Sequence, residues 1–519
     1  MEWAIAFVAA VAAALLSLET LGHIQRAGYR FSLGKRAAQE QLRLALLSLV
    51  WATLTAAAYA LEQSFDAEYA LWLYLGVFSL SACLFTLCTW VRSKQHLKFT
   101  PRAVRLLCAL FVVDFFLARL LAQIGSDIFE SGKGAFAALF LVPLLTLPGA
   151  ALARAFIYPL EAIVFSRFVK RARRRLEGMS GLVVIGVTGS YGKTSVKNMI
   201  ATLLGDRAYA TPASYNTPMG VCKAISDMPE GVKYFVCEMG AGRRGDIARL
   251  CSIVRPQIGV ITGIAPQHLK TFKSLENIVA TKGELIDSLP CKGIAVFNGY
   301  DDLCADMFKK CVLRRKFITG ERGVSFSDVE LDEEGSRFLL KAGGEERRCF
   351  LRLVGRHNME NFCLAMQTCL ALGEDVNELC ERASEIAPVP HRLEVLKTRG
   401  GITILDDGYN SNVRGAKAAL DALSLFKGRK VVAAQGFAEA GKADEKLNTA
   451  LGEQIACVAD IVVLIGVKAE FLRRGLEKHA FPPERIYIES SLERAQKLFA
   501  RILREGDVLL IENDMPENL

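Results

Sequence analysis

The run Val184-Ile-Gly-Val-Thr-Gly-Ser-Tyr-Gly-Lys-Thr-Ser195 constrains the fold more than any other part of the sequence. Apolar residues 183 to 187 are typical of a buried strand, Gly189 and Gly192 allow a tight turn, and Lys193 opens a helical pattern. Such a turn points backbone amides and a helix N-terminus at a phosphate group, while lysine supplies charge and a hydroxyl supplies a magnesium ligand. The run therefore predicts a nucleotide-binding α/β domain.

The loop departs from the general phosphate-loop pattern at one position, because Val187 stands where that pattern has glycine. A glycine turn without a ligand is therefore an alternative interpretation. The apolar strand before the turn and the helical sequence SVKNMIATLL after it favour the phosphate loop. The candidate phosphate ligands are the turn and the first helical residues, namely Gly189, Ser190, Gly192, Lys193, Thr194 and Ser195.

Long apolar stretches dominate the first 155 residues and contrast with the rest of the chain. Most of them approach the ~20 residues that a helix needs to cross a bilayer. They predict an N-terminal α-helical transmembrane bundle over residues 1–155, although the first stretch also resembles the core of a signal peptide. The five stretches are residues 3–18, 42–61, 69–91, 104–124 and 135–150.

The segments that connect these stretches alternate between basic and non-basic. The second connection, 62–68, has no lysine or arginine, and the fourth, 125–134, has only Lys133. Because basic residues accumulate on the cytoplasmic side of a membrane, five spans place the N-terminus outside and everything after residue 150 inside. The basic residues of the first and third connections are Arg26, Arg30, Lys35, Arg36, Arg92, Lys94, Lys98 and Arg102.

Charged residues near the apolar stretches point to a lipid environment. The net charge of +9 is concentrated beside them, where anionic lipid headgroups explain it better than nucleic acid does. Residues 156–180 form a linker that we expect to be interfacial over 156–169, with a sixth apolar segment as the alternative, and basic over 170–175. Asp114 and Arg119 fall inside the fourth stretch, and we interpret them as a structural pair rather than a lipid-headgroup or transport site.

Short apolar runs alternate with helical patterns from about residue 181 onward, which is typical of α/β domains with mostly parallel sheets. The pattern predicts a phosphate-loop ATPase-type domain over residues 181–351 and a Rossmann-like C-terminal domain over residues 352–519. The 14 cysteines include no CxxC pair, so a thiolate zinc site is not expected. The predicted strands are 182–187, 234–237, 258–261 and 293–297, followed by 402–405, 430–434, 461–465 and 507–511.

Polar residues follow two predicted strands of the first α/β domain, at the sheet edge where ligands bind. Glu238 follows the second strand and is well placed to hold Mg²⁺ directly or through water. His268 lies beyond the third strand, and it is either a site residue or a structural histidine. Lys282 by itself is typical of an exposed helix residue.

Ten short motifs occur between residue 182 and about residue 420, in the order TGSYGKTSVK, NTPMG, CEMGAGRRGDI, RPQIGVIT, HL, FKSLENI, TKGE, GRHNMEN, HRLE and DDGYNSN. Together they resemble the Mur ligase family, whose members use ATP to join an amino acid or peptide to a carboxylate in peptidoglycan synthesis. The members that add D-alanyl-D-alanine are the most similar. The family's own loop has the shorter TGxxGKT form, which accounts for Val187.

The resemblance implies roles for residues of the first α/β domain. Lys193 and the loop amides bind the phosphates of ATP, and Thr194 and Glu238 hold one Mg²⁺. His268 helps to place a second Mg²⁺. Lys282 is the position that CO₂ carbamylates in several members, which turns a cation into an oxygen ligand. Lys193, Glu238, His268 and Lys282 are thus the candidate catalytic residues.

The resemblance also implies how the C-terminal domain contributes. Asn298 lies beside the nucleotide base, while Arg392 and Asp407 reach ATP from the C-terminal domain, which closes over the site. The implied reaction has two steps. A substrate carboxylate attacks the γ-phosphate to give an acyl phosphate, and an incoming amine then captures the acyl group.

The chain departs from the family in its N-terminal part and in the domain that receives the amine. The apolar stretches replace the family's UDP-sugar domain, and GFAEAGKADEKLN and IENDMPENL differ from the usual LGxMxELG and KGS. We therefore expect a multi-pass ligase of the bacterial cytoplasmic membrane, with cytoplasmic catalytic domains, that adds D-alanyl-D-alanine or a related amine. Its acceptor is a UDP-linked or lipid-linked muramoyl peptide.

Two other functions are compatible with the sequence. One is a Mur-like amide ligase that makes a poly-amino-acid or modifies another lipid-linked glycan. The other is a membrane transporter or scaffold with a degenerate ligase domain, against which the intact Lys193, Glu238, His268 and Lys282 argue. The expected partners are the substrates, the lipid bilayer and cell-wall synthesis proteins, but no nucleic acid.

Overall fold

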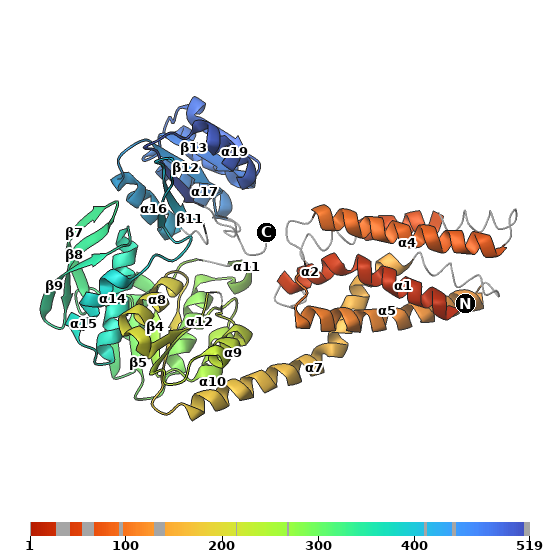
Figure 1. Cartoon of the computed structure of the whole chain (residues 1–519), viewed down its shortest axis with the longest axis horizontal. Coiled ribbons are helices and arrows are strands. Elements are labelled where there is room, and N and C mark those ends of the chain that lie inside the picture. The colour runs from red at the N-terminus through yellow and green to blue at the C-terminus, as the bar shows by residue number, and fades with distance from the viewer. Residues whose placement is uncertain are drawn as a thin grey trace. The chain divides into compact units, whose positions relative to one another are not determined.

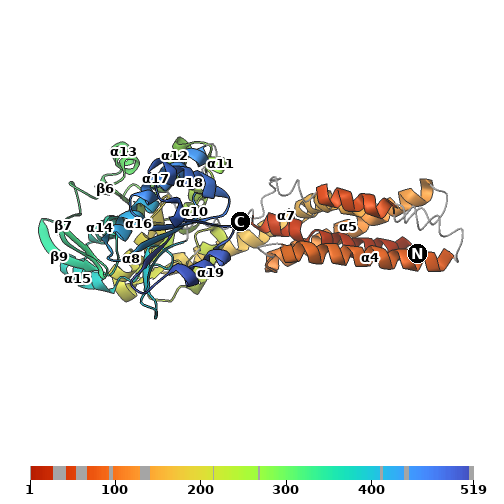
Figure 2. The same ribbon diagram turned by 90° about the horizontal axis from the view of Figure 1, so that it is seen from above.

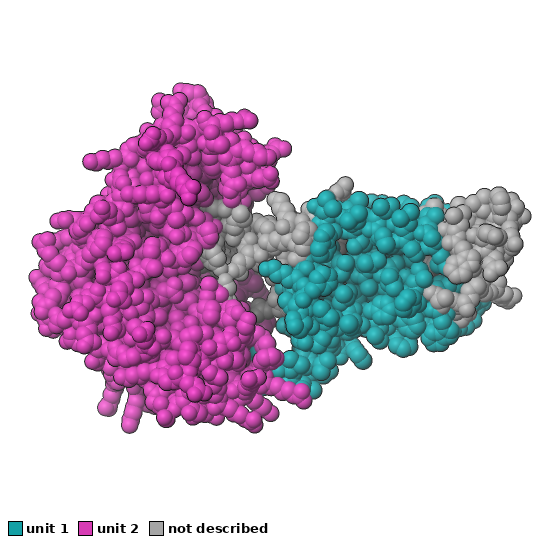
Figure 3. Space-filling model, in the orientation of Figure 1, with its two compact units in different colours: residues 1–166, 517–519 teal, residues 167–516 magenta. Residues whose placement is uncertain are grey.

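A computed structural model describes residues 2–26, 42–53, 67–92, 97–128, 141–213, 215–266, 269–408, 413–437 and 443–512. The chain forms two compact units, which divide between Ser166 and Arg167 (Figure 3). The first unit is helical. The described strands all belong to the second, and several of its strands and helices are labelled in Figure 1.

Antiparallel helix packing holds the first unit together. The alanine-rich face of α1 packs against α5, where Trp3 lies 5.9 Å from Phe115 and Phe7 lies 5.8 Å from Phe111 between ring centroids. Glu161 of α7 accepts a 2.6 Å hydrogen bond from Arg105 of α5 and so joins these two helices. The helices are α1 (Glu2–Leu16), α2 (Leu18–Arg26), a segment over Leu42–Thr53, α4 (Ala67–Arg92), α5 (Pro101–Ile128) and α7 (Val142–Gly178).

The described part of each predicted apolar stretch is helical, but residues 54–61 and 135–140 lie outside the described residues. Among the described helices, one segment, Thr146–Gly178, is long and apolar enough to cross a membrane. The pair Ile5–Leu16 and Leu18–Gln25 meets the same criterion only when taken together, and it bends by 44°.

Two sequence expectations about this unit were wrong. From Val142 onward, the segments predicted separately at 135–150 and 156–169 form one helix, α7, which continues through Pro148 and Pro159. Asp114 and Arg119 do not pair. Asp114 of α5 is buried against Gly149 of α7, whereas Arg119 donates a 3.1 Å hydrogen bond to Gln123, one turn along its own helix.

The first sheet of the second unit is parallel, with the strand order β2-β3-β1-β4-β5-β6. Its register sets Val187 beside Glu238 on one side and Val260 on the other, so the carboxyl ends of three strands meet at one edge. The four predicted strands are confirmed, and two short edge strands are added. The strands are β1 (Val183–Thr188), β2 (Ala208–Ala210), β3 (Tyr234–Glu238), β4 (Ile258–Ile261), β5 (Ile294–Phe297) and β6 (Arg315–Ile318).

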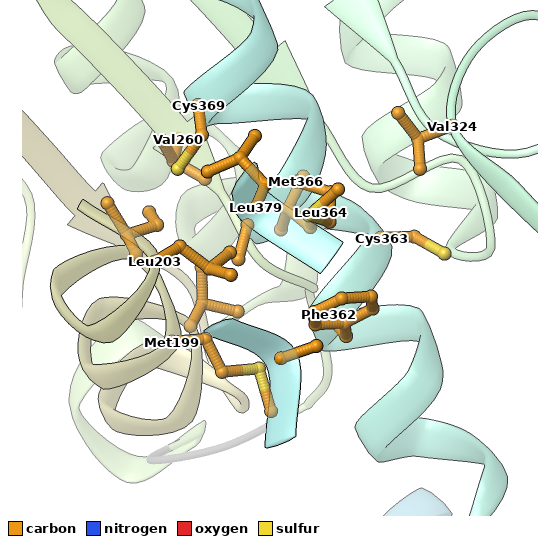
Figure 4. Close-up of a cluster of buried hydrophobic side chains, with 14 of the residues drawn as sticks. Met199, Leu203, Val260, Val324, Phe362, Cys363, Leu364, Met366, Cys369 and Leu379 are labelled. Carbon is orange, nitrogen blue, oxygen red and sulfur yellow. The ribbon is translucent and has the colours of Figure 1, made fainter. Parts of the chain in front are cut away.

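Helices cover both faces of this sheet. One face carries α8 and α14, and Met199, Leu203, Val260, Phe362 and Met366 lie in their common core (Figure 4). On the other face α12 lies close to the strands, and a Cβ on Gly186 would lie 2.8 Å from a methyl group of Leu285. The helices are α8 (Lys193–Leu204), α9 (Pro218–Asp227), α10 (Asp246–Val254), α11 (Leu269–Phe272), α12 (Leu275–Asp287), α13 (Asp302–Lys310), α14 (Arg356–Ala371) and α15 (Val376–Arg382).

The sequence pattern assigned α14 and α15 to the domain over residues 352–519, but their side chains pack in the core of the first sheet. It also did not predict a three-stranded antiparallel sheet, which follows the first large sheet and precedes the second in the sequence. Phe338 of this small sheet lies 5.8 Å from Phe362, so the small sheet extends the same core. Its strands are β7 (Ser325–Asp332), β8 (Gly335–Ala342) and β9 (Glu345–Leu351).

The second large sheet has the order β10-β11-β15-β12-β13-β14 and is parallel except for β10. One face packs against α16, α17 and α18 and the other against α19, which confirms a second doubly wound domain (Figure 2). The elements are β10 (Glu394–Lys397), β11 (Thr403–Asp407), α16 (Val413–Leu425), β12 (Lys430–Ala434), α17 (Asp444–Ala456), β13 (Ile461–Ile465), α18 (Ala469–Lys478), β14 (Ile486–Glu489), α19 (Leu492–Ile502) and β15 (Val508–Glu512).

Candidate nucleotide and ligation site

The loop between β1 and α8 has a tight backbone that needs glycine at two positions. A Cβ on Gly189 would lie 2.1 Å from the hydroxyl of Thr262, and Gly192 has φ 76°. The Ser190 amide donates to the Gly263 carbonyl at 2.7 Å, which holds the loop against the end of β4. The sequence expectation of a strand, a tight turn and a helix is confirmed.

Lys193 is the first residue of α8, and its side chain reaches back into this loop. Its ammonium donates to the carbonyl oxygens of Gly189 and Ser190 at 3.0 and 3.1 Å. Burial lowers the pKa of Lys193 to about 8; the Arg392 charge also lowers it, while Glu238 raises it. The side chain therefore places a cation in the loop, where it can meet a phosphate.

Glu238 is the buried acceptor at the centre of the site. The Thr194 hydroxyl donates to its two carboxylate oxygens at 3.2 and 3.1 Å, and the Lys197 ammonium lies 3.4 Å from one of them. Lys197 is 2% exposed and also donates to the Thr211 carbonyl at 2.7 Å. Lys197 is the last residue of the TGSYGKTSVK motif, but the sequence did not indicate a role for it. Its position one helical turn after Lys193 was the available signal.

The donor set fits a magnesium ion that also binds phosphate. Thr194 and Glu238 bring a hydroxyl and a carboxylate together, and such oxygen ligands suit Mg²⁺, which usually keeps water and phosphate oxygens as its remaining ligands. The described residues contain no group of three or more histidine, cysteine, aspartate or glutamate side chains that could hold a metal alone. His268 lies outside the described residues.

Lys282 is buried in α12 rather than exposed. Burial, with a smaller contribution from the charge of Lys193, lowers the pKa of Lys282 to about 7. The influence of Lys193 places both lysines in one electrostatic environment. A neutral amine at this position can react with an electrophile such as CO₂.

Arg392 and Asp407 come from the C-terminal domain. Asp407 accepts a 3.1 Å hydrogen bond from the Leu393 amide, and burial raises its pKa to about 6 while Arg392 opposes that shift. Because Arg392 also acts on Lys193, these two residues lie in the same charged environment as the loop. Asn298 is buried, and its amide nitrogen donates to the Thr262 carbonyl at 2.8 Å. Its role beside a nucleotide base stays a prediction.

A cavity of about 230 Å³ extends from Ser195 along α8 to Arg392. Its lining combines polar groups, among them Asn198 and Asn358, with apolar side chains of the segment that leads to the C-terminal domain. A mixed lining of this kind suits a nucleoside attached to phosphates in the neighbouring loop. The sequence did not predict a binding role for either asparagine, although Asn358 lies within the GRHNMEN motif.

We predict that Lys197→Met lowers the free energy of unfolding of the second unit by about 3–5 kcal/mol, because it leaves Glu238 buried without its ammonium partner. Hydrogen exchange of the α8 amides measures this loss. The matched control is Lys309→Met, which breaks a solvent-exposed pair with Asp306 and should leave the stability almost unchanged. Adding Glu238→Gln to Lys197→Met should recover part of the stability, and a further loss would contradict the buried-charge explanation.

Two domain families match the second unit in sequence order. The Mur ligase middle domain matches residues 187–369, and the Mur ligase glutamate ligase domain matches residues 391–512. Together they cover more than half of the chain. Residues 1–186 lie outside both matches.

Curated relatives carry the name UDP-N-acetylmuramoyl-tripeptide--D-alanyl-D-alanine ligase. The protein from Bacillus subtilis is 28% identical over 337 residues, which are 64% of this chain and 73% of that protein. The protein from Mycobacterium tuberculosis is 31% identical over 299 residues, which are 56% of this chain and 58% of that protein. The match thus spans less than two thirds of the mycobacterial relative.

Solved structures agree with this relationship. MurF from Thermotoga maritima in complex with ADP aligns with a TM-score of 0.59 and 28% identity, covering 67% of this chain and 80% of that one. MurF from Acinetobacter baumannii has the same fold, with a TM-score of 0.61 and 23% identity over 67% of this chain and 77% of that one. Because the middle and C-terminal domains of Mur ligases both match, in the same order along the sequence, the chain belongs to the Mur ligase family.

Proposed function

We propose that this protein is an ATP-dependent ligase that joins D-alanyl-D-alanine to a muramoyl peptide through an acyl phosphate. The observation that carries the proposal is the convergence of groups from both domains. Lys193 and the Thr194–Glu238 pair lie in the first, and Arg392 of the second lines one cavity with Ser195 of α8. The substrates are those named for the bacterial relatives of this chain.

The proposed reaction begins with the peptide carboxylate, which is a poor electrophile because it has no good leaving group. Its oxygen attacks the γ-phosphorus of ATP, the bond to ADP breaks, and an acyl phosphate forms. Lys193 in the loop neutralises charge on the transferring phosphoryl group. Thr194 and Glu238 would hold Mg²⁺, which supplies further neutralisation of the phosphates when bound.

In the second proposed step the amine nitrogen of D-alanyl-D-alanine attacks the acyl carbon. The carbon–oxygen bond to phosphate breaks, the nitrogen loses a proton, and an amide and inorganic phosphate result. The C-terminal domain brings Arg392 and Asp407 to the nucleotide, and its movement would assemble the site around both substrates. Exclusion of water at this stage protects the acyl phosphate from hydrolysis.

We also propose that the first unit is a transmembrane bundle that holds the ligase at the cytoplasmic membrane. Large apolar side chains are exposed on its helices, including Leu49 at 66%, Val91 at 73% and Phe116 at 62%, and such exposure is typical of a surface that meets lipid or another protein. In the second unit, exposed cations recur at helical spacing of three and four on the last part of α7, where anionic headgroups would attract them. They are Arg167, Lys170, Arg171 and Arg174.

We predict that the detergent-purified protein converts ATP to ADP over many turnovers only when both a muramoyl tripeptide and D-alanyl-D-alanine are present. Lys193→Ala should lower this rate about 10²- to 10³-fold, because it removes a preorganised cation from the phosphate loop. The exposed Lys309→Ala variant is the control and should keep the wild-type rate. Product masses identify the amide, and parallel reactions with UDP-linked and lipid-linked acceptors distinguish the two carriers. Turnover without D-alanyl-D-alanine incorporation would contradict the proposed amine.

We propose that Lys282 is carbamylated, because its neutral amine can add CO₂ with release of one proton. A pKa near 7 makes the neutral form dominant above about pH 7, so the carbamate signal from ¹³C-labelled bicarbonate should grow as the pH rises through that value. Magnetic resonance of the carbamate carbon measures it. The signal should disappear in Lys282→Ala and persist in Lys309→Ala, and its persistence in Lys282→Ala would contradict the assignment.

Native cysteines test the membrane arrangement. Cys457 is exposed in the C-terminal domain, so a membrane-impermeant maleimide should label it in opened cells but not in intact spheroplasts. Mass spectrometry of the labelled peptide gives the readout, and Cys457→Ser is the control. Alkaline washing should leave the protein in the membrane fraction. Labelling in intact spheroplasts would overturn the orientation, and release by alkali would overturn the bundle.

A further inference from the structure

Arg414 of α16 joins the C-terminal domain to the phosphate loop. Its guanidinium donates to the hydroxyl of Tyr191 at 2.7 Å, to the Tyr300 carbonyl at 3.0 Å and to Glu360 at 2.8 Å, and it lies 3.6 Å from Asp301. Three further residues of α16, Ala416, Ala419 and Leu420, lie in the core of the second sheet. These four partners of Arg414 belong to the part of the chain built around the first sheet.

Tyr191 is part of the phosphate loop itself, between Ser190 and Gly192. Its ring fills the space beside Gly263, where a Cβ would lie 2.2 Å from the ring, and its carbonyl accepts a hydrogen bond from Thr262. The Tyr191 hydroxyl donates to Asp301 at 2.6 Å while it accepts from Arg414. Any movement of Arg414 therefore acts on the backbone that forms the phosphate site.

The charges around Arg414 make its position specific. Asp301 and Glu360 are both buried, at 6% and 9% exposure, and Arg414 faces both carboxylates. Burial raises the pKa of Glu360, whereas Arg414 lowers it. Asp301 also caps α13 by accepting from the Cys304 amide at 2.9 Å. Withdrawal of Arg414 would leave Glu360 with the longer 3.8 Å pair to Arg356, and Asp301 with hydrogen bonds from neutral donors, so the contact favours one placement of the C-terminal domain.

Resting on the ligase function proposed above, we propose that Arg414 and the Tyr191 hydroxyl form an interdomain latch. The latch holds the C-terminal domain where Arg392 and Asp407 reach the nucleotide, and it transmits occupancy of the phosphate loop to α16. Arg414 is thus a positioning residue. It acts through Tyr191 and through domain placement, without contact to the reacting atoms.

The first test separates positioning from stability. Arg414→Gln should lower kcat at least tenfold with a smaller change in KM for ATP, and Tyr191→Phe should act in the same direction. Combining the two should cost less than the sum of the two single effects, because both remove the hydrogen bond between Arg414 and Tyr191. Adding Glu360→Gln to Arg414→Gln should restore the unfolding midpoint by removing the uncompensated acid, while kcat stays low. Recovery of kcat together with stability would reduce Arg414 to a structural role and overturn the latch.

Arg429→Gln is the matched control, because Arg429 forms a similar pair with buried Asp507 at 2.6 Å within the C-terminal domain. It should lose stability and retain kcat per folded molecule. Arg414→Lys keeps the charge but lacks the forked geometry that reaches Tyr191, Tyr300 and Glu360 together, so it should recover only part of the rate.

The second test does not depend on the amine substrate. ATP should slow amide hydrogen exchange at the start of α16 in the wild-type protein and in Arg429→Gln, but not in Tyr191→Phe or Arg414→Gln. Equal slowing in all four proteins, or none in the wild type, would overturn the latch. If the wild type shows this slowing but makes no D-alanyl-D-alanine product, the proposed function fails while the latch stands.

Discussion

The structure of the site depends on how one buried carboxylate is neutralised. Glu238 ends β3 below the surface; the Lys197 ammonium balances its charge and the Thr194 hydroxyl donates to it, both from α8. These contacts fix α8 against the neighbouring strand and so fix the phosphate loop that precedes it. Two lysines one turn apart therefore have different roles. Lys197 contacts Glu238 and the Thr211 carbonyl, whereas the Lys193 ammonium lies in the loop.

Much of the second unit could be predicted from the sequence, because its central strands are short apolar runs that end in glycine or polar residues. The strand predicted at 258–261 coincides with β4, and the one at 430–434 coincides with β12. The small antiparallel sheet was not predicted, because β7 and β9 lie at the surface and alternate weakly. Even its clearest signal, Gly343-Gly344 with both φ values positive, is a turn that carries no apolar periodicity.

The candidate site was only partly predictable, because motifs specify residue types and not their surroundings. Lys282 has an ordinary helical sequence around it, and only the packing of α12 against the sheet shows that it is buried beside other charges. Arg414 belongs to none of the ten motifs. Its partners are distant in sequence and come together only where the two domains meet, so no local pattern could identify it. In the first unit, apolar content predicted helices, but it did not reveal that Asp114 packs against Gly149.

The packing of α14 has a consequence for how the chain folds during synthesis. This helix shares one core with β1 and β4, yet it begins almost a hundred residues after β4 ends. At a translation rate of about 5–20 residues per second, the part of this apolar face that α8 does not cover stays exposed for on the order of ten seconds. Throughout that interval the emerging chain exposes apolar side chains that are buried in the folded protein, and a ribosome-associated chaperone would have time to bind them.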